Sequence, residues 1–203
     1  MKNDYGTGPD KISIPPTLLF SLFGDHPDVR KTATSDFKSV GDRIYLVGTS
    51  HQELGASELA YMMLESGDAH GIGGQVPQLP HPEQNLSTYR ALAAAVRNGT
   101  VRTAHDCSEG GVAVALAEMC IGGRLGASVD IDGTGEGDVW GRLWGESLGR
   151  FVVAVSPENE AQFLTSMKGH PTTVLGAVSD SSLLEVSDGD CLLYTSPSPR
   201  DEL

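Results

Sequence analysis

AHDCSEGG, residues 104–111, leads directly into VAVALAEM, residues 112–119. The second segment is rich in alanine and other apolar residues, and it predicts a helix that packs tightly against a sheet. We expect Ser108 to be the N-cap of this helix, because a serine oxygen can accept hydrogen bonds from the free N–H groups of the first turn. Gly110 and Gly111 carry no Cβ, so a ligand could approach this turn closely.

The start of this predicted helix is a candidate site for a phosphate group. Exposed backbone N–H groups and the positive end of the helix dipole both favour an anion there. Asp106 comes just before, and a magnesium ion that also binds the phosphate would explain a carboxylate at this position. The alternative is an ordinary helix cap, because Ser-x-Gly-Gly is a weak signal on its own.

The composition limits the class of protein. The chain has 203 residues, of which 39% are hydrophobic and 25 are glycine, as in an α/β or α+β enzyme domain. The net charge of −13 argues against binding to nucleic acid or to an anionic membrane surface, since both need basic patches. No apolar run approaches the roughly 20 residues that span a bilayer, and no signal peptide is visible.

The chain has three cysteines: Cys107, Cys120 and Cys191. Their odd number and lack of metal-type spacing are typical of cytosolic thiols, so we expect a cytoplasmic protein. Cys107 is a candidate nucleophile because it lies beside His105 and Asp106. The adjacent carboxylate should raise the pKa of the Cys107 thiol, which disfavours that role.

The hydrophobic pattern predicts alternating strands and helices. Strands are expected at residues 43–48, 101–105, 127–131, 151–155, 172–178 and 183–186. Helices are expected at residues 57–64, 85–98, 109–120 and 157–167, with a short helix or turn at 140–144. This order favours a mixed sheet with helices packed on it, either α+β or α/β.

Some segments carry more specific expectations. The apolar run Thr17–Phe23 predicts a buried strand, and the helix at 57–64 should bury Leu59, Met62 and Met63. Leu86, Leu92, Ala93 and Val96 should form the apolar side of the helix at 85–98. The loop histidines His70 and His81 read as solvated, with metal ligation as the alternative. Residues 191–203 contain two Ser-Pro pairs and no periodicity, as in a disordered or vector-derived tail.

Five motifs occur in one order along the chain: KISIPPTLL (11–19), GDRIYLVG (41–48), ELGASE (53–58), HDCSEGG (105–111) and GESLGRF (145–151). Together they resemble the phosphoribosylformylglycinamidine synthase family over about residues 1–187. That family contains two copies of a pair of N- and C-domains of the aminoimidazole-ribonucleotide-synthetase type. The HDxSEGG form resembles the C-domain of the second copy.

The resemblance implies the fold and the domain limits. The fold would be α+β: a mixed sheet with helices packed on it, in three α/β/α layers. Residues 1–39 would be the closing piece of the N-domain and a linker, 40–187 the C-terminal domain, and 188–203 the tail. Met1 then reads as an internal methionine and the chain as a fragment, which should expose an apolar face where its N-domain packs.

The resemblance also implies the reaction. The family uses ATP and Mg2+ to convert formylglycinamide ribonucleotide and glutamine-derived ammonia into the amidine, in purine biosynthesis. The partners implied are the N-domain of the same synthetase and a glutaminase domain or subunit. The catalytic histidine of the N-domain and its main magnesium ligands have no counterpart here, so the chain should be inactive alone.

Site residues follow from the same motifs. By resemblance, Asp106 binds magnesium, and Ser108, with Glu109, Gly110 and Gly111, binds the nucleotide. His105, Glu146 and Ser147 are candidate contacts to substrate or phosphate. The alternative for GESLGRF is a turn that leads into a strand, with Arg150 paired to a nearby carboxylate.

Two other functional classes remain open. The chain could be a non-catalytic module that binds a nucleotide or a partner subunit. It could also belong to a related ATP-using enzyme, either selenophosphate synthetase or the carbamoyl-dehydrating hydrogenase maturation protein, whose C-domains carry similar HDxxxGG runs. The motifs at 11–19 and 145–151 favour the amidine-forming synthetase.

Overall fold

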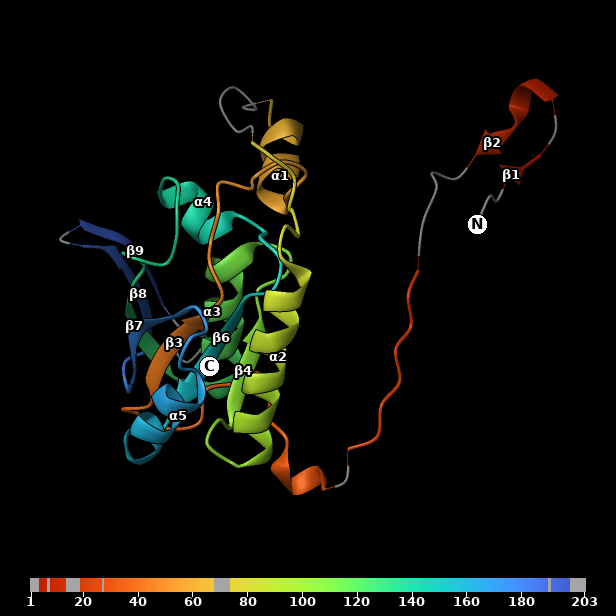
Figure 1. Ribbon diagram of the computed structural model, residues 1–203. Coiled ribbons are helices and arrows are strands. Elements are labelled where there is room, and N and C mark those ends of the chain that lie inside the picture. Colours follow the sequence, from red (N-terminus) through yellow and green to blue (C-terminus); the bar gives the residue numbers. More distant parts are fainter. Residues whose placement is uncertain are drawn as a thin grey trace.

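A computed structural model describes residues 4–6, 8–13, 19–26, 28–67, 74–189 and 191–197. Its centre is a seven-stranded sheet in the order β4-β6-β3-β7-β5-β8-β9 (Figure 1). The strands are β3 (Arg43–Val47), β4 (Thr103–Asp106), β5 (Gly126–Asp130), β6 (Phe151–Val155), β7 (Thr172–Ser179), β8 (Leu183–Asp188) and β9 (Cys191–Pro197). The β5–β8 pair is parallel and the other five pairs are antiparallel, so the sheet is mixed as predicted.

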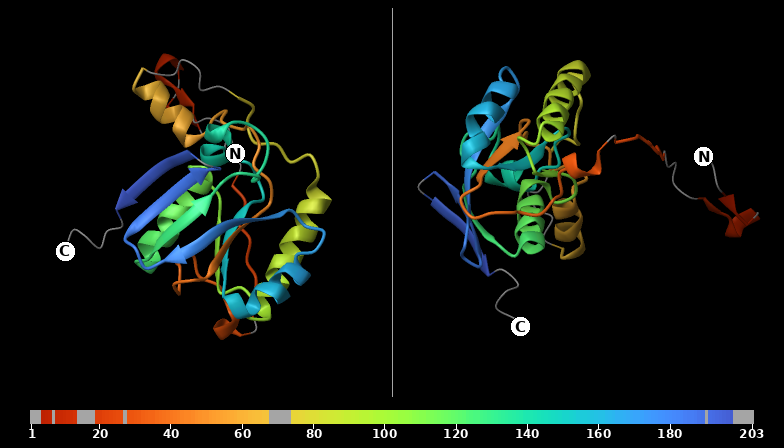
Figure 2. Two further views of the ribbon diagram at one scale, coloured as in Figure 1. Left: turned by 90° about the vertical axis from the view of Figure 1, so that its left-hand side faces the viewer. Right: turned by 90° about the horizontal axis from the view of Figure 1, so that it is seen from below.

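Helices cover both faces of this sheet. They are α1 (Glu58–Glu65), α2 (Pro82–Arg97), α3 (Gly111–Gly123), α4 (Val139–Trp144) and α5 (Glu160–Ser166), with short 3-10 turns at Gly8–Asp10, Val29–Lys31 and Pro157–Asn159. Figure 2 shows α2 and α5 on one side of the sheet and α3 on the other. The predicted three-layer α+β fold is therefore confirmed.

Alternation along the central strands explains the two layers of core. Successive side chains of a strand point to opposite faces, so Ile44 and Leu46 pack with α3 and α4. Tyr45 and Val47 pack on the opposite face with α2 and α5. The ring of Tyr45 lies 5.0 Å from that of Phe163 in α5. Both faces of β3 are thus buried, and this strand lies inside the sheet, between β6 and β7.

The predicted buried strand at residues 17–23 is wrong for the part that the structure describes. Residues 19–23 form no strand, and Leu19, Phe20, Leu22 and Phe23 are 78–98% exposed. Among the described residues no strand pairs with this segment, so its apolar side chains have nothing to pack on. Thr17 and Leu18 lie outside the described residues.

The N-terminal part also contains a small pair of strands, β1 (Asp4–Tyr5) and β2 (Ile12–Ser13), which are antiparallel. Figure 1 shows that residues 4–6, 8–13 and 19–26 lie away from the main body. Packing against that body begins near Thr34, which bridges to Thr103, and Phe37 is 1% exposed in the core. The domain limit at residue 39 stays a prediction.

Two predicted helix faces differ in detail. Met62 is 64% exposed, Leu59 and Met63 are half-buried, and α1 has no fully buried residue. In α2, Leu92 is buried as predicted, but Leu86 is 47% exposed and Ala95 lies in the core instead.

Among the described residues, no helix combines the length and the hydropathy needed to cross a lipid bilayer.

The expectation of a disordered tail is wrong for residues 191–197, which form β9. This strand pairs antiparallel with β8 from Asp188↔Cys191 to Leu183↔Pro197 and makes the edge of the sheet. Edge pairing uses backbone groups, so it needs no hydrophobic pattern in the sequence. Residues 198–203 lie outside the described residues.

Candidate functional site

The start of α3 differs from its prediction. The N-cap is Gly110, with φ 75° and no side-chain cap, so the prediction that Ser108 caps the helix is wrong. Gly110, two positions after Ser108, has the left-handed backbone conformation, which glycine adopts at little energetic cost. The Gly111 N–H donates to the backbone oxygen of Ser108 at 3.0 Å, and the Ser108 hydroxyl turns elsewhere.

Asp106 and Ser108 place a carboxylate and a hydroxyl side by side, Asp106 at the end of β4 and Ser108 two residues later. The Ser108 hydroxyl donates to Oδ2 of Asp106, and this hydrogen bond is the main reason why the pKa of Asp106 lies below its usual value. The Asp106 side chain is 65% exposed. Its carboxylate therefore stays ionised at neutral pH and lies largely in solvent.

Glu146 occupies the position at the start of α3 that we expected an external anion to take. Its Oε1 accepts the Gly110 N–H at 2.9 Å and also the N–H of Glu58, the first residue of α1, at 2.9 Å. One carboxylate oxygen thus joins the beginnings of two helices. A phosphate at this point would have to share the space with a negative charge of the chain itself.

The glycine pair serves packing, which corrects the expectation that it leaves room for a ligand. A Cβ on Gly111 would lie 2.5 Å from the Gly145 oxygen and 2.6 Å from the Leu143 oxygen. A Cβ on Gly110 would lie 2.2 Å from Cγ2 of Val114. Gly111 therefore lets α3 pack directly on the end of α4. The space where its side chain would lie is already filled by the backbone of residues 143–145.

One cavity of about 340 Å³ brings several predicted residues together. Asp106, Ser108 and Glu146 line it, although Glu146 is far from the other two in sequence. The remaining lining residues are Pro77, Tyr89, Cys107, Leu148, Gly149, Arg150 and Phe151. The predicted metal ligand, the predicted phosphate ligand and the GESLGRF turn therefore share a single site.

Five other predicted residues do not line this cavity: Gly110 and Gly111, described above, and Ser147, His105 and Glu109. Ser147 is 1% exposed, and its hydroxyl accepts the His51 N–H at 3.0 Å. His105 places Nε2 2.9 Å from Glu118 and Nδ1 2.8 Å from the Asp106 backbone oxygen, so both ring nitrogens already have partners. Glu109 is exposed on the surface. The geometry gives these three no contact with a ligand at the Asp106 cavity.

Arg150 is the residue whose role the sequence did not reveal. It is 1% exposed, and its guanidinium donates to the Ser147 oxygen at 2.9 Å, to Oγ of Ser50 at 2.8 Å and to the Gly145 oxygen. Its hydrogen bonds go to these groups and not to a carboxylate, which corrects the expected pairing. Burial lowers the pKa of Arg150, and the charges of Glu53 and Glu146 act in the opposite direction.

Two further observations limit the chemistry of the site. Burial raises the pKa of the Cys107 thiol to about 11, so a thiolate nucleophile is disfavoured at neutral pH. Among the described residues, no group of three or more His, Cys, Asp or Glu side chains is placed to hold a metal ion. Asp106 and Ser108 can supply only part of a metal coordination shell, with the rest from phosphate oxygens, water or another domain.

The comparisons with known proteins match this fold. Residues 39–189 match the family model described as AIR synthase related protein, C-terminal domain. The structure of T. maritima PurL complexed with ATP superposes with a TM-score of 0.63 at 23% identity, over 83% of this chain and 27% of that one. Phosphoribosylformylglycinamidine synthase II from Thermotoga maritima gives 0.64 at 23% identity, over 81% and 26%.

A more distant likeness is to hydrogenase maturation protein HypE, with a TM-score of 0.55 at 13% identity, over 84% of this chain and 57% of that one. At these identities the superpositions establish the fold. The chain spans about a quarter of the length of the protein chain in each of these two Thermotoga structures.

Proposed function

The chain belongs to the family of AIR synthase related proteins, whose C-terminal domain fills residues 39–189, and we propose that it is this domain in the second half of a phosphoribosylformylglycinamidine synthase. That enzyme is an ATP-dependent C–N ligase. In this proposal it converts formylglycinamide ribonucleotide and glutamine-derived ammonia into formylglycinamidine ribonucleotide, in the cytoplasm. The two Thermotoga structures, one of them an ATP complex, support this assignment over the HypE type, which superposes less well.

The observation that carries the proposal is the convergence of Asp106, Ser108 and Glu146 on one cavity at the start of α3. An ionised, exposed carboxylate and a hydroxyl supply hard oxygen ligands, which suit Mg2+. The donor set therefore fits a magnesium ion that also touches nucleotide phosphate. When bound, such an ion would neutralise phosphate charge beside the helix.

The chain supplies half of this proposed nucleotide site. Asp106 and Ser108 offer too few oxygens to complete an octahedral shell. The exposed apolar run that includes Leu19, Phe20 and Phe23 is a surface that an N-domain could cover. We therefore propose an N-domain as the direct partner and a glutaminase domain or subunit as the ammonia source, with little activity from this chain alone.

Replacing Asp106 by asparagine tests the nucleotide site. We expect the full chain to bind ADP weakly and only with magnesium, and Asp106→Asn to weaken this binding at least about tenfold. Removing a residue that only hydrogen-bonds to a metal ligand lowers metal affinity about 10–100-fold. Removing a ligand itself should lower the affinity at least as much. Titration calorimetry with and without magnesium measures the effect.

Asp25→Asn is the matched control, because Asp25 is exposed and lies outside the cavity. Its binding heats should equal those of the wild type. Equal heats for Asp106→Asn and the wild type would remove Asp106 from the site and with it the proposed function of this cavity.

Replacing Glu146 by glutamine should strengthen nucleotide binding, the opposite of the effect expected for Asp106→Asn. Glutamine keeps an acceptor oxygen for the Gly110 and Glu58 N–H groups but removes the negative charge beside the phosphate. We expect magnesium–ADP to bind about fivefold more tightly, since two charges 4 Å apart in water interact by about 1 kcal/mol. The same calorimetry measures it, and a weaker affinity would show that Glu146 binds the metal or the nucleotide directly.

A further inference from the structure

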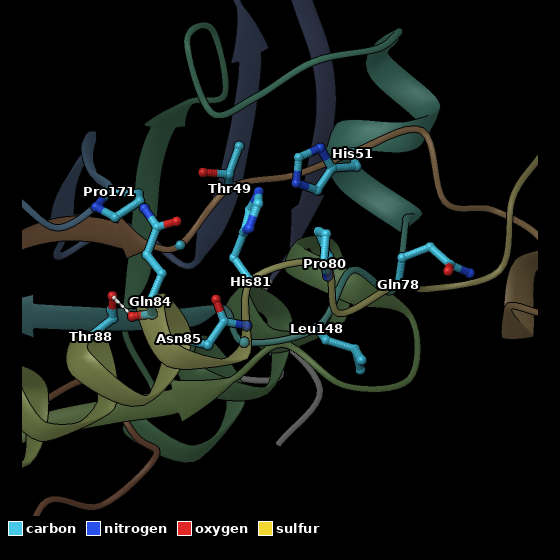
Figure 3. Close-up of a pocket in the computed structure, with 12 residues that line it drawn as sticks. Thr49, His51, Gln78, Pro80, His81, Gln84, Asn85, Thr88, Leu148 and Pro171 are labelled. Carbon is cyan, nitrogen blue, oxygen red and sulfur yellow. Dashed lines mark hydrogen bonds between the residues drawn. The ribbon is translucent and has the colours of Figure 1, made fainter.

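The loop of residues 74–80, which leads into α2, forms part of the walls of three cavities. Pro77 lines the Asp106 cavity. Gln78 and Pro80 line a neighbouring cavity of about 190 Å³, and Figure 3 shows both on the segment that leads into α2. Most of the loop also lines a third cavity, of about 710 Å³. The position of this loop therefore affects how open the Asp106 cavity is.

Hydrogen bonds tie the 74–80 loop to the ELGASE motif, for which the proposed nucleotide site gives no role. The Gly55 N–H donates to the Gln75 backbone oxygen at 3.0 Å. The Gln78 N–H donates to Oε1 of Glu53 at 2.8 Å. A Cβ on Gly55 would lie 2.6 Å from the backbone oxygen of the first loop residue, so glycine allows the two segments to approach this closely. The start of the motif thus holds the loop.

Glu53 connects the 74–80 loop to the Asp106 cavity. Its backbone oxygen accepts the N–H of Glu146, which lines that cavity, at 3.2 Å. Glu53 is 6% exposed, and its Oε2 is buried without a hydrogen-bond partner in the part of the chain that the structure describes. Burying a carboxylate oxygen in this way is unfavourable, and water could reach it if the loop moved outward. The hydrogen bond from Gln78 therefore opposes a tendency of the loop to open.

The 74–80 loop has few buried contacts of its own. Every residue in it except Pro77 is exposed, and Val76 and Leu79 are 50% and 47% exposed. Segments with few buried contacts open locally at a low free-energy cost, without unfolding of the whole domain. The hydrogen bonds to the ELGASE motif are thus a main constraint on the position of this loop.

We propose that the 74–80 loop is a lid over the Asp106 cavity and that Glu53 is the positioning residue that holds this lid closed. The closed lid would slow the entry and release of a nucleotide, and this regulatory role rests on the proposed function. The opening of the lid is a property of the chain itself, so it can be measured without any ligand.

Two cysteines distinguish opening of the lid from unfolding of the domain. Cys107 lines the Asp106 cavity together with Pro77 and is 7% exposed, so its reaction with iodoacetamide reports opening of that cavity. Cys120 in α3 is 4% exposed and does not line the cavity, so its reaction reports unfolding. Peptide mass spectrometry of the full chain measures both rates in one sample. The ratio of the Cys107 rate to the Cys120 rate is the readout.

Replacing Glu53 by alanine should raise this ratio at least about tenfold, which corresponds to about 1.4 kcal/mol, the order expected for one hydrogen bond to a charged group. Glu53→Gln keeps an acceptor for the Gln78 N–H, so its ratio should stay within about threefold of the wild type. Adding magnesium–ADP to the wild type should lower the Cys107 rate, because a bound nucleotide would fill the cavity beneath the lid.

A variant of the lid itself keeps the test valid if Glu53→Ala does not fold. Pro77→Gly leaves Glu53 in place, removes part of the cavity wall and gives the loop more freedom, so it should also raise the ratio. Pro157→Gly is the matched control, because Pro157 is an exposed proline of a 3-10 turn and does not line the cavity. Its ratio should equal that of the wild type.

The proposal is overturned if the ratio for Glu53→Ala, or for Pro77→Gly where Glu53→Ala does not fold, equals that of the wild type. It is also overturned if Glu53→Gln raises the ratio as much as Glu53→Ala, since the effect would then come from the charge lost near Arg150. Magnesium–ADP that binds in calorimetry but does not protect Cys107 would overturn the regulatory role. If magnesium–ADP does not bind, the proposed function fails, and the ratios without ligand still decide whether the loop is a lid.

Discussion

Replacing Arg150 by alanine should lower the free energy of unfolding by about 3–5 kcal/mol, since each buried acceptor left without a donor costs about 1–3 kcal/mol. Arg150 is 1% exposed and donates to Ser147, Ser50 and Gly145. Its loss would leave these buried acceptors without donors and would remove the positive charge near Glu53. Urea unfolding followed by circular dichroism measures the change.

Arg90→Ala is the control for this experiment, because Arg90 is exposed in the middle of α2. It should change the free energy of unfolding by less than about 0.5 kcal/mol. Arg150→Lys should fall between the two, since lysine keeps the charge but lacks the planar group of donors. If Arg150→Ala were as stable as Arg90→Ala, the guanidinium would not be holding the 145–150 turn together.

Replacing Gly111 by alanine should cost about 3 kcal/mol or more. The residue has φ 64°, a conformation that costs an L-residue about 1–2 kcal/mol. The new Cβ would also lie 2.5 Å from the Gly145 oxygen and 2.6 Å from the Leu143 oxygen, which are backbone atoms that cannot swing aside. The junction of α3 and α4 would have to open, and overpacking of this kind costs about 1–3 kcal/mol more.

Gly99→Ala separates the two contributions to this cost. Gly99 has φ 76°, and no atom of the described chain lies within 4 Å of a Cβ built there. This variant should lose only the conformational part, about 1–2 kcal/mol. The difference in urea midpoint between the two variants then measures the close approach of α3 to α4. If both variants lost the same stability, the end of α4 would move away from the new Cβ at no energetic cost.

The strongest elements of the fold were predictable because their signals are local. β3 and β6 are short β-branched segments bounded by glycine or polar residues, and the structure has them at Arg43–Val47 and Phe151–Val155. The helix expected at residues 57–64 is α1, and the structure adds that Ser57 is its N-cap, accepting the Ala60 N–H at 3.2 Å. The alternation within β3 also accounts for helices on both faces of the sheet.

The detail of the candidate site was less predictable because it depends on backbone conformation and on distant contacts. Ser108 and Gly110 both suit an N-cap by residue type, and the left-handed conformation of Gly110 decides between them. Glu146 reaches Gly110 across 36 positions in the sequence, and Arg150 reaches Ser50 across 100. A sequence motif identifies such residues as candidates for a site. Whether they contact a ligand or each other depends on the tertiary packing of the chain.

The burial of segments was the other source of error. An apolar pattern predicts that one side of a segment is buried, but it does not show which element packs against that side. Leu19 and Phe23 have the composition of a core strand and lie exposed. β9 has no apolar periodicity and still completes the sheet, because β8 offers it an unpaired edge. Both cases depend on what lies beside the segment in space, which the residues of the segment do not encode.

The strand order has a consequence for synthesis on the ribosome. Among the described strands, β3 pairs only with β6 and β7, and β4 pairs only with β6. β5 pairs only with β7 and β8, which come later in the sequence. No two strands of the seven-stranded sheet can therefore join until Phe151–Val155 has left the exit tunnel. Until then the nascent domain carries unpaired apolar strands, a state that chaperones shield.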